Sequence, residues 1–395
     1  MSEGRDVGSG AFGAVVGVAI VIALAAVLRL MVTAASDEPA AAQRSLADVL
    51  GAGVDAHGFE RAEGRRTFRF PADHGAHPGY RSEWWYFTGN LVAADGRHFG
   101  YQLTLFRFAL ASPGVHDEIA GSPLRPDALY MGHFAITDTA AGNFSSFERF
   151  GRGAGGLAGA TEASAVDRRM TVFLDDWEVV WDEGVWRIAA AADGHRLELE
   201  LEALKPVTLQ GDAGLSKKSA EKGNASWYYS LTRLETRGGL TTPEGAFTVT
   251  GTSWLDREWS TSALSRDQVG WDCFALQLSD GSELMFYRLR TADGGADAAS
   301  AGRIVAPDGS PRPLALADVA LRPGRRFVSP VSGARYPVVW SLKIADTETS
   351  LTVRPRVDAQ EHTGAFRYYE GAVEVSGRHR GRSVTGVGYI ELTGY

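Results

Sequence analysis

The segment 251–259, GTSWLDREW, combines two acidic residues with two tryptophans at the end of a strand pattern, AFTVTG. If the strand continues, neighbouring side chains point to opposite faces, so Trp254, Asp256 and Glu258 share one face. Arg257 then lies on the other face and cannot neutralise them locally. Carboxylates beside tryptophans are costly to bury unless they are paired or protonated. One hypothesis is an acid whose pKa is raised by an aromatic wall, and the alternative is a strand end whose carboxylates meet water or backbone amides.

A second aromatic cluster, SEWWYFTGNL, occupies residues 82–91. In a strand, Trp84 and Tyr86 share one face, while Trp85 and Phe87 share the other. Both faces are then apolar, as in a wall with a packed exterior and a lined interior. Trp84 and Tyr86 are predicted to line a pocket for an elongated apolar ligand. A simple role in the barrel core suits Trp85 and Phe87 at least as well as the lining role suits Trp84 and Tyr86.

Other motifs that could carry chemistry lack the context that the chemistry needs. Residues 151–156 spell G-x-G-x-x-G, but a dinucleotide site needs a helix after this motif, and here it lies in a Gly/Ala-rich loop. His74 and His77 have the spacing of half a metal site, yet no matching ligand pair follows, so we predict solvated loop histidines and no metal. No G-x-S-x-G motif supports a serine hydrolase. No cofactor is expected.

The composition favours a β-rich protein that does not bind nucleic acid. The 395 residues are enough for two domains, and 44% of them are hydrophobic. Trp (10), Tyr (12), Phe (18) and Gly (47) are plentiful, which favours short strands joined by turns. The net charge of -8 and the pI near 5.7 give no electrostatic reason to expect a nucleic-acid partner.

Hairpin patterns follow one another along the chain, with one short helix expected near residues 260–266. The segments 84–108 and 271–290 resemble each other, because each opens with Trp, crosses a turn that ends in Asp-Gly and returns through an aromatic residue to Arg. General similarity among β-hairpins would explain this equally well. The number of strands is enough for two antiparallel barrels or sandwiches. If each hairpin begins its own barrel, the boundary between them lies near residues 260–270.

The N-terminal segment differs from the rest of the chain. Residues 11–28 are apolar or small and carry no charge, which is long for a signal-peptide core and just enough for a transmembrane helix. We predict export, with the body periplasmic or extracytoplasmic, either after cleavage or anchored in the inner membrane by this helix. The single cysteine, Cys273, cannot form an intramolecular disulfide and is expected to be a small strand residue.

Several blocks of the sequence together resemble the carotenoid 1,2-hydratase and AttH-like family, whose members are often labelled predicted secreted hydrolases. The similarity extends from about residue 68 to residue 395, in the blocks EWWYFTGNL with GYQLTLFRF, YMGHFAITD, WLDREWS, GWDCFALQLSDGSELMFYRLR and GYIELTGY. It implies an all-β protein with two consecutive lipocalin-like antiparallel β-barrel domains. With the N-terminal pattern, the predicted parts are a signal peptide or anchor (1–35), a linker (36–60), an N-terminal barrel (61–262) and a C-terminal barrel (263–395).

The resemblance also implies a site and a range of activities. Characterised hydratases of the family add water across a terminal double bond of an acyclic carotenoid without a cofactor, through an acidic residue. Other relatives act as pericyclase-like enzymes on polyenes, and the AttH-like branch resembles a periplasmic partner of an ABC transporter. Carried over onto WLDREW, the acid is Asp256, with Glu258 as the second predicted catalytic residue. The predicted ligand-binding residues are Trp84, Tyr86, Trp227, Tyr229, Trp254 and Trp271.

Acid catalysis on an alkene would require both the acidic and the aromatic residues of this predicted site. Protonating an alkene creates a carbocation, so the reaction needs a strong acid in a dry pocket, and each aromatic face near a cation contributes ~0.5–2 kcal/mol. The first hypothesis is therefore a cofactor-independent hydratase of an isoprenoid or other apolar ligand, which requires Asp256 to be buried beside aromatic residues and open to a cavity. The second is a non-catalytic carrier of a lipid-like ligand working with an ABC transporter. The third is a secreted hydrolase, for which no nucleophile, base and oxyanion site can be assembled.

Overall fold

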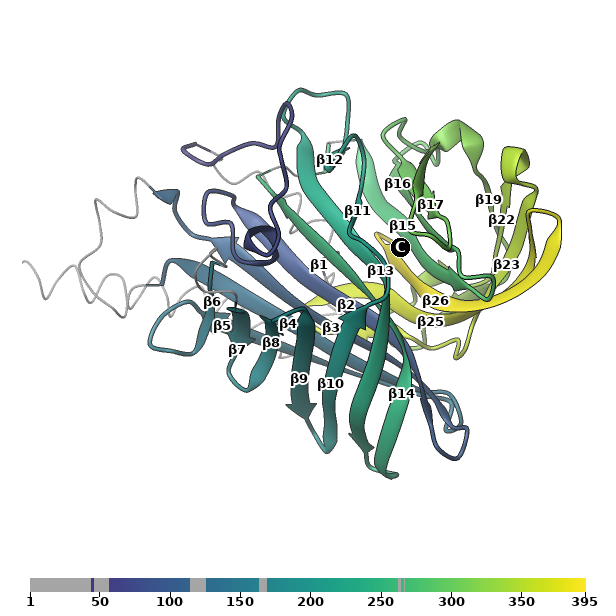
Figure 1. The fold of residues 1–395 in the computed structure, drawn as a ribbon, viewed down its shortest axis with the longest axis horizontal. Coiled ribbons are helices and arrows are strands. Elements are labelled where there is room, and N and C mark those ends of the chain that lie inside the picture. Colours follow the sequence, from purple (N-terminus) through teal and green to yellow (C-terminus); the bar gives the residue numbers. More distant parts are fainter. Residues whose placement is uncertain (1–43, 46–56, 114–125, 163–168, 262–263, 266) are drawn as a thin grey trace, which may run out of the picture. The chain divides into compact units, whose positions relative to one another are not determined.

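A computed structural model of the chain describes residues 44–45, 57–113, 126–162, 169–261, 264–265 and 267–395. Residues 44–395 form one compact unit. It consists of a 13-stranded sheet that forms a nearly closed antiparallel barrel, a second sheet of 11 strands and a two-stranded hairpin (Figure 1). The predicted all-β fold is therefore confirmed.

The first sheet has the strand order β5-β4-β3-β2-β14-β13-β10-β9-β8-β7-β6, and β11 and β12 also pair with β13. Because β7 also contacts β4 and β5, the sheet nearly closes. Its core includes Trp85, Phe87, Trp177 and Trp186. The strands are β2 (Ser82–Ala93), β3 (His98–Ala109), β4 (Ala128–Asp138), β5 (Asn143–Arg152), β6 (Ala158–Ala160), β7 (Arg169–Leu174), β8 (Trp177–Asp182), β9 (Val185–Ala192), β10 (His195–Ala203), β11 (Thr208–Leu209), β12 (Leu215–Lys217), β13 (Ala225–Thr242) and β14 (Gly245–Ser260).

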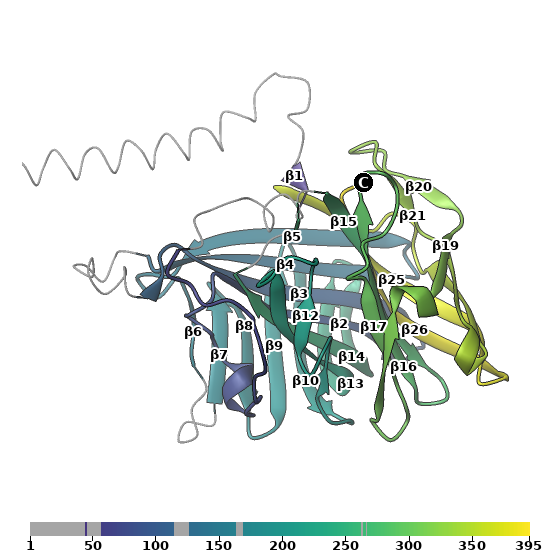
Figure 2. The same ribbon diagram turned by 90° about the horizontal axis from the view of Figure 1, so that it is seen from above.

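The second sheet has the strand order β18-β17-β16-β15-β26-β25-β23-β22-β19 and packs around its own core, which includes Phe274, Trp340 and Tyr369. Both β24 and β1 pair with β25. In Figures 1 and 2 this sheet, green to yellow, lies beside β2, β13 and β14 of the first sheet. Its strands are β1 (Arg44–Ser45), β15 (Gln268–Leu278), β16 (Glu283–Thr291), β17 (Ala301–Val305), β18 (Pro311–Ala315), β19 (Ala320–Pro323), β22 (Trp340–Ile344), β23 (Thr349–Pro355), β24 (Glu361–Thr363), β25 (Phe366–His379) and β26 (Arg382–Thr393), while β20 (Arg326–Val328) and β21 (Arg335–Pro337) form the hairpin.

The two sheets share one topology. In each, apart from the short β1, the first strand pairs with the last, β2 with β14 and β15 with β26, and the strands that follow the first extend to one side. This common order supports the similarity between segments 84–108 and 271–290 as a structural repeat. The first sheet ends at Ser260 and the second resumes at Gln268. No helix is described between them, and the helices of the described residues are the 3₁₀ turns η2 (Ala72–His74), η3 (Leu316–Asp318) and η4 (Ala345–Thr347).

The predicted N-terminal segments fall largely outside the described residues. This applies to residues 1–35, including the apolar stretch 11–28. Within the part that the structure describes, no helix combines the length and apolar character needed to cross a membrane. In the predicted linker, β1 pairs in parallel with Phe366 and Arg367 of β25.

A buried ion-pair network lies beside Trp85 on the barrel side of the first sheet. Arg257 donates from Nη2 to Oε2 of Glu83 at 2.5 Å, and Arg107 donates to Oε1 at 3.1 Å. Neither Glu83 nor Arg257 is exposed, and the guanidinium of Arg257 lies 3.8 Å from the centre of the Trp85 ring. Burial alone would raise the pKa of Glu83, but Arg257, with His77 and Arg107, holds it well below its usual range. Arg257 therefore faces the barrel, as the strand alternation predicted.

The two histidines predicted to be solvated are instead enclosed by aromatic residues. His74 is 5% exposed, its Nδ1 lies 2.6 Å from the Tyr229 hydroxyl, and burial lowers its pKa to about 3, so the ring is neutral. His77 stacks on Trp259, with 3.7 Å between the ring centres. The prediction was wrong because a polar segment with isolated histidines does not reveal that it folds back against the barrel.

Replacing Arg257 by methionine should lower the free energy of unfolding by about 3–5 kcal/mol, because Glu83 then stays buried without its closest cation. Urea denaturation followed by tryptophan fluorescence measures the loss. Arg187→Met is the matched control, since its pair with Glu200 is exposed and should contribute at most about 1 kcal/mol. Similar losses in both variants would contradict a special role for the buried pair.

Candidate active site

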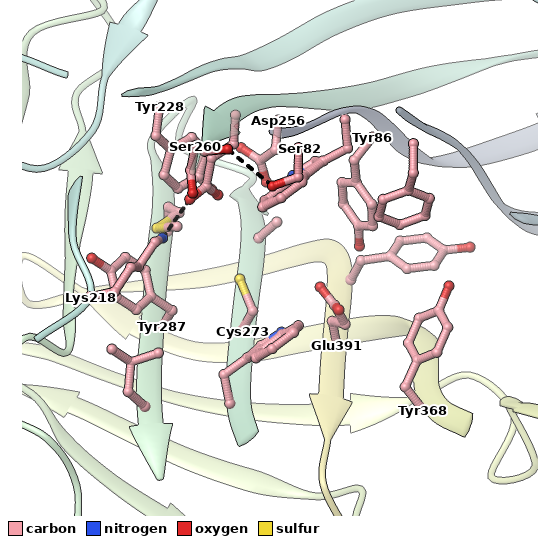
Figure 3. A pocket seen from close by; sticks show the side chains of 18 of the residues that line it. Ser82, Tyr86, Lys218, Tyr228, Asp256, Ser260, Cys273, Tyr287, Tyr368 and Glu391 are labelled. Atoms are coloured by element: carbon pink, nitrogen blue, oxygen red, sulfur yellow. Dashed lines mark hydrogen bonds and ion pairs between the residues drawn. The ribbon is translucent and has the colours of Figure 1, made fainter. Parts of the chain in front are cut away.

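A candidate site is a cavity of about 140 Å³ between the two sheets, outside the main core of each sheet (Figure 3). Strands β2, β3, β13 and β14 provide one wall, and β15, β16, β25 and β26 provide the other. Most of the exposed surface of its lining is apolar. The space for a ligand therefore depends on both sheets.

The first strands of the two sheets present matching residues to this cavity. WWYF on β2 contributes Trp84 and Tyr86, and WDCF on β15 contributes Trp271 and Cys273. Both pairs lie two residues apart, so the alternation of a strand places each pair on one face. The similarity between the two hairpins thus extends to the residues that line the cavity.

The last strands of the two sheets each present one acid. WLD on β14 places Asp256 in the cavity wall, and YIE on β26 places Glu391 in the opposite wall (Figure 3). Strand pairing sets Asp256 beside Tyr86 and Glu391 beside Cys273. Equivalent strands therefore bring two acids to one largely apolar space.

Asp256 is 6% exposed and accepts hydrogen bonds from two side chains, one on its own strand and one on the neighbouring β13. The indole of Trp254 donates to its Oδ1 at 2.9 Å, and the Ser230 hydroxyl donates to the same atom at 2.5 Å. Burial raises the pKa of Asp256 to about 6, although hydrogen bonds from Ser230, Trp254 and Tyr228 oppose the shift. At neutral pH most of the group is therefore a carboxylate.

Glu391 is the less acidic group of the two. Burial raises its pKa to about 8, the charges of Asp256 and Glu258 add to the rise, and a hydrogen bond with Trp271 opposes it. At neutral pH most of this group is therefore protonated. The cavity thus holds a carboxylate and a carboxylic acid on opposite walls.

A second glutamate, Glu370 on β25, lies beside Glu391. The two residues are direct partners in the β25–β26 pairing, and Glu370 is completely buried. The Tyr86 hydroxyl, from the opposite wall, donates to its Oε1 at 2.6 Å. Burial and the charge of Glu391 raise the pKa of Glu370 well above its usual value. Its surroundings therefore favour the neutral form of Glu370.

Glu258, the second predicted catalytic residue, is held in an ion pair. Its Oε1 lies 2.6 Å from the Lys218 ammonium, and the Ser226 hydroxyl donates to the same oxygen. The Lys218 ammonium also lies 5.5 Å and 5.1 Å from the ring centres of Tyr228 and Tyr287. This arrangement compensates the charge of Glu258 at one end of the cavity (Figure 3).

Most of the predicted site residues lie in or beside the cavity. Asp256, Glu258, Trp84, Tyr86 and Trp271 line it, and Trp254 adjoins it through its hydrogen bond to Asp256.

The placement of Trp227 and Tyr229 in this site was wrong. Both residues pack with Trp259 in a separate cluster on the other face of the sheet. Tyr228 lines the cavity instead, because it pairs with Glu258 in the neighbouring strand. The alternate residues of β13 that face the cavity were therefore predicted one position out of register.

Sequence reasoning missed Glu391, Glu370 and Lys218. The signal for the two glutamates was a lone acid within the apolar strand patterns YIEL and YYEG, but their proximity depends on the pairing of β25 with β26. Lys218 follows β12 in a polar segment that carries no such signal. No cluster of three or more His, Cys, Asp or Glu residues suited to a metal ion occurs in the described residues.

Comparisons with known proteins agree with this architecture. A crystal structure of an AttH candidate from Nitrosomonas europaea has a TM-score of 0.74 and 32% identity, and the match covers 85% of this chain and 100% of that chain. Kievitone hydratase from Nectria haematococca has a TM-score of 0.61 and 15% identity, covering 85% and 97%. CghA has a TM-score of 0.50 and 12% identity, covering 84% and 93%. At these lower identities, the likeness shows a common fold alone.

No curated protein matches the sequence. The family model described as AttH-like matches residues 61–395, which is most of the chain. With the structure from Nitrosomonas europaea, this match shows that the chain belongs to the AttH-like family.

Proposed function

We propose that the protein adds water to a carbon–carbon double bond of an apolar ligand, with Glu391 as general acid and Asp256 as general base. The observation that carries the proposal is the pair of carboxyl groups on opposite walls of one largely apolar cavity, with pKa values of about 8 and about 6. Surroundings that push the pKa values of two carboxyl groups apart distinguish an acid from a base.

The proposed reaction begins with proton transfer from Glu391. Its O–H bond breaks, and the π electrons of the ligand form a new C–H bond, which leaves a carbocation on the second carbon. The oxygen of a water molecule then forms a C–O bond with that carbon, and the Asp256 carboxylate accepts the proton that the water loses. Transfer of this proton back to Glu391, directly or through water, restores both groups. The product is the ligand plus one water.

This assignment changes the role that the sequence suggested for Asp256. The motif WLDREW suggested Asp256 as the acid, but a group with a pKa of about 6 is mostly ionised at neutral pH, while Glu391 keeps its proton. An ionised Asp256 suits the second half of the reaction, because it stabilises the carbocation and orients the attacking water. The rings of Trp84, Tyr86 and Trp271 line the same space and stabilise a cation through their faces.

The size and polarity of the cavity favour an isoprenoid or polyene as the ligand. A volume of about 140 Å³ is close to that of an apolar protein cavity of roughly 150 Å³ that binds benzene. The space therefore suits the reacting end of a chain and requires a longer ligand to extend beyond it. A fold neighbour named kievitone hydratase supports hydration as the reaction class. The alternative that the sequence predicts is a carrier of a lipid-like ligand.

Asp256→Asn and Glu391→Gln should each lower the hydration rate by about 10²–10⁴-fold, the typical contribution of one general acid or base. The parent protein is purified from its native host, its bound molecules are identified by native mass spectrometry and solvent extraction, and they are incubated with each variant. Conversion is measured as a mass gain of one water. Glu361→Gln is the matched control, since Glu361 is a buried glutamate outside the cavity, bonded to Ser329, Ser332 and Tyr336.

A carrier would give a different result. Parent protein and both variants would then hold the same apolar molecule, and none would convert it. That outcome would reject hydration and retain the cavity as a binding site.

The raised pKa of Asp256 also predicts a pH-dependent cost to stability. The native state binds this proton more tightly than the unfolded state does, so stability falls as pH rises from about 4 to about 6 and stays lower above that. The shift of about two pKa units corresponds to roughly 3 kcal/mol at most. Asp256→Asn should therefore raise the melting temperature at pH 8 more than at pH 4, measured by differential scanning calorimetry. An equal change at both pH values would contradict the burial of an ionised Asp256.

A further inference from the structure

We propose that Glu370 is a positioning residue that holds a proton beside Glu391 and donates it as a hydrogen bond to the carboxylate that Glu391 becomes during the reaction. This inference rests on the proposed function, because it deepens the account of how the acid at that site works. It concerns a residue that is not among those lining the cavity and that adjoins two lining residues, Glu391 and Tyr86.

The two oxygens of Glu370 have different surroundings. Oε1 accepts a hydrogen bond from the Tyr86 hydroxyl at 2.6 Å. Oε2 is buried and has no hydrogen-bond partner among the described residues. An ionised oxygen would be costly to leave in that state, whereas a protonated oxygen has an O–H group available to donate. Glu391 is directly opposite on β26, where paired residues have Cβ atoms about 4.5–5.5 Å apart.

The charges around Glu370 also favour its neutral form. Neither Glu370 nor Glu391 forms an ion pair within the described part of the chain, and Lys218 is already paired with Glu258. The titratable groups that interact with Glu370 are Tyr86 on β2, Asp256 on β14, Cys273 on β15, Tyr368 and Tyr369 on β25, and Tyr389 and Glu391 on β26. All of these groups are acids, so each one that ionises makes ionisation of Glu370 less favourable.

The repeat between the two sheets gives an independent reason to expect a donor at this position. In the first sheet, YYS on β13 precedes WLD on β14, and Ser230 pairs with Asp256. In the second sheet, YYE on β25 precedes YIE on β26, and Glu370 pairs with Glu391. Ser230 donates its hydroxyl hydrogen to Asp256 at 2.5 Å. Glu370 occupies the equivalent position opposite the second acid.

A hydrogen bond from Glu370 would act mainly after proton transfer has begun. When the O–H bond of Glu391 breaks, negative charge develops on a carboxylate that has no ion-pair partner among the described residues, and the Glu370 O–H can point to it. Hydrogen bonds to an ionised acceptor are roughly twice as strong as those between neutral groups. Because this bond strengthens as the charge forms, it would stabilise the transition state more than the bound ligand.

Two substitutions at one position test the donor role. Glu370→Gln keeps the shape, accepts from Tyr86 and still offers N–H donors, so kcat should stay within about threefold of the parent. Glu370→Met removes the donor and should lower kcat by about 10- to 100-fold, with KM little changed, because a charge-assisted hydrogen bond is lost from the transition state. The alkaline limb of its pH–rate profile should move to higher pH, since Glu391 becomes a weaker acid. A large loss of kcat in Glu370→Gln, with an alkaline limb at lower pH, would show an ionised Glu370 and overturn the inference.

Infrared spectroscopy tests the protonation of Glu370 without any assay of activity. At pH 7 the parent protein should show C=O stretching of buried carboxylic acids, and Glu370→Gln should lose one component of that band. The control Glu361→Gln should keep the components assigned to the cavity. An unchanged band in Glu370→Gln would overturn the inference whether or not the protein hydrates a ligand. Loss of the component in a protein that hydrates nothing would support the buried proton and reject the proposed function alone.

Discussion

The alternation of side chains along β14 is the constraint on which both the barrel and the candidate site depend. This strand lies in the middle of the first sheet, between β2 and β13, and its two faces meet different dry environments. Arg257 points to the barrel and pairs with Glu83, while Asp256 and Glu258 point to the cavity. A shift of one residue would exchange these faces. It would place a carboxylate against Glu83 and an arginine among the aromatic rings, so the ion pair and the cavity fix the same register.

The buried carboxyl groups on the barrel side and on the cavity side of β14 differ in how their charge is compensated. On the barrel side, Glu83 has arginine partners, and its pKa lies well below the usual range. On the cavity side, Asp256 and Glu391 have hydrogen-bond donors but no arginine partner within the described part of the chain, and their pKa values are raised. The first arrangement stabilises the fold. The second leaves part of the burial cost uncompensated, which is common where a site needs reactive groups.

Much of the fold could be predicted from the sequence because strand patterns and hairpin turns are local signals. The residues of WLDREW and EWWYF that face the cavity also follow from the alternation of one strand. The orientation of Trp227 and Tyr229 did not, because the parity of β13 is fixed by its pairing with Glu258 and its neighbours on β14. Glu391 is 135 residues from Asp256 in the chain, so no local pattern could place it in the same cavity. The burial of His74 likewise depends on contacts with distant aromatic rings.

The common topology of the two sheets has a consequence for how such a site can originate. Two identical sheets joined through these faces would present the same acid with the same donor from both sides, and only the repulsion between the acids would separate their two titration steps. In this chain the two sheets differ at these positions. Serine pairs with aspartate in the first sheet, and glutamate pairs with glutamate in the second. With a common strand order, the residues at these few positions give the two equivalent acids different surroundings and different proton affinities.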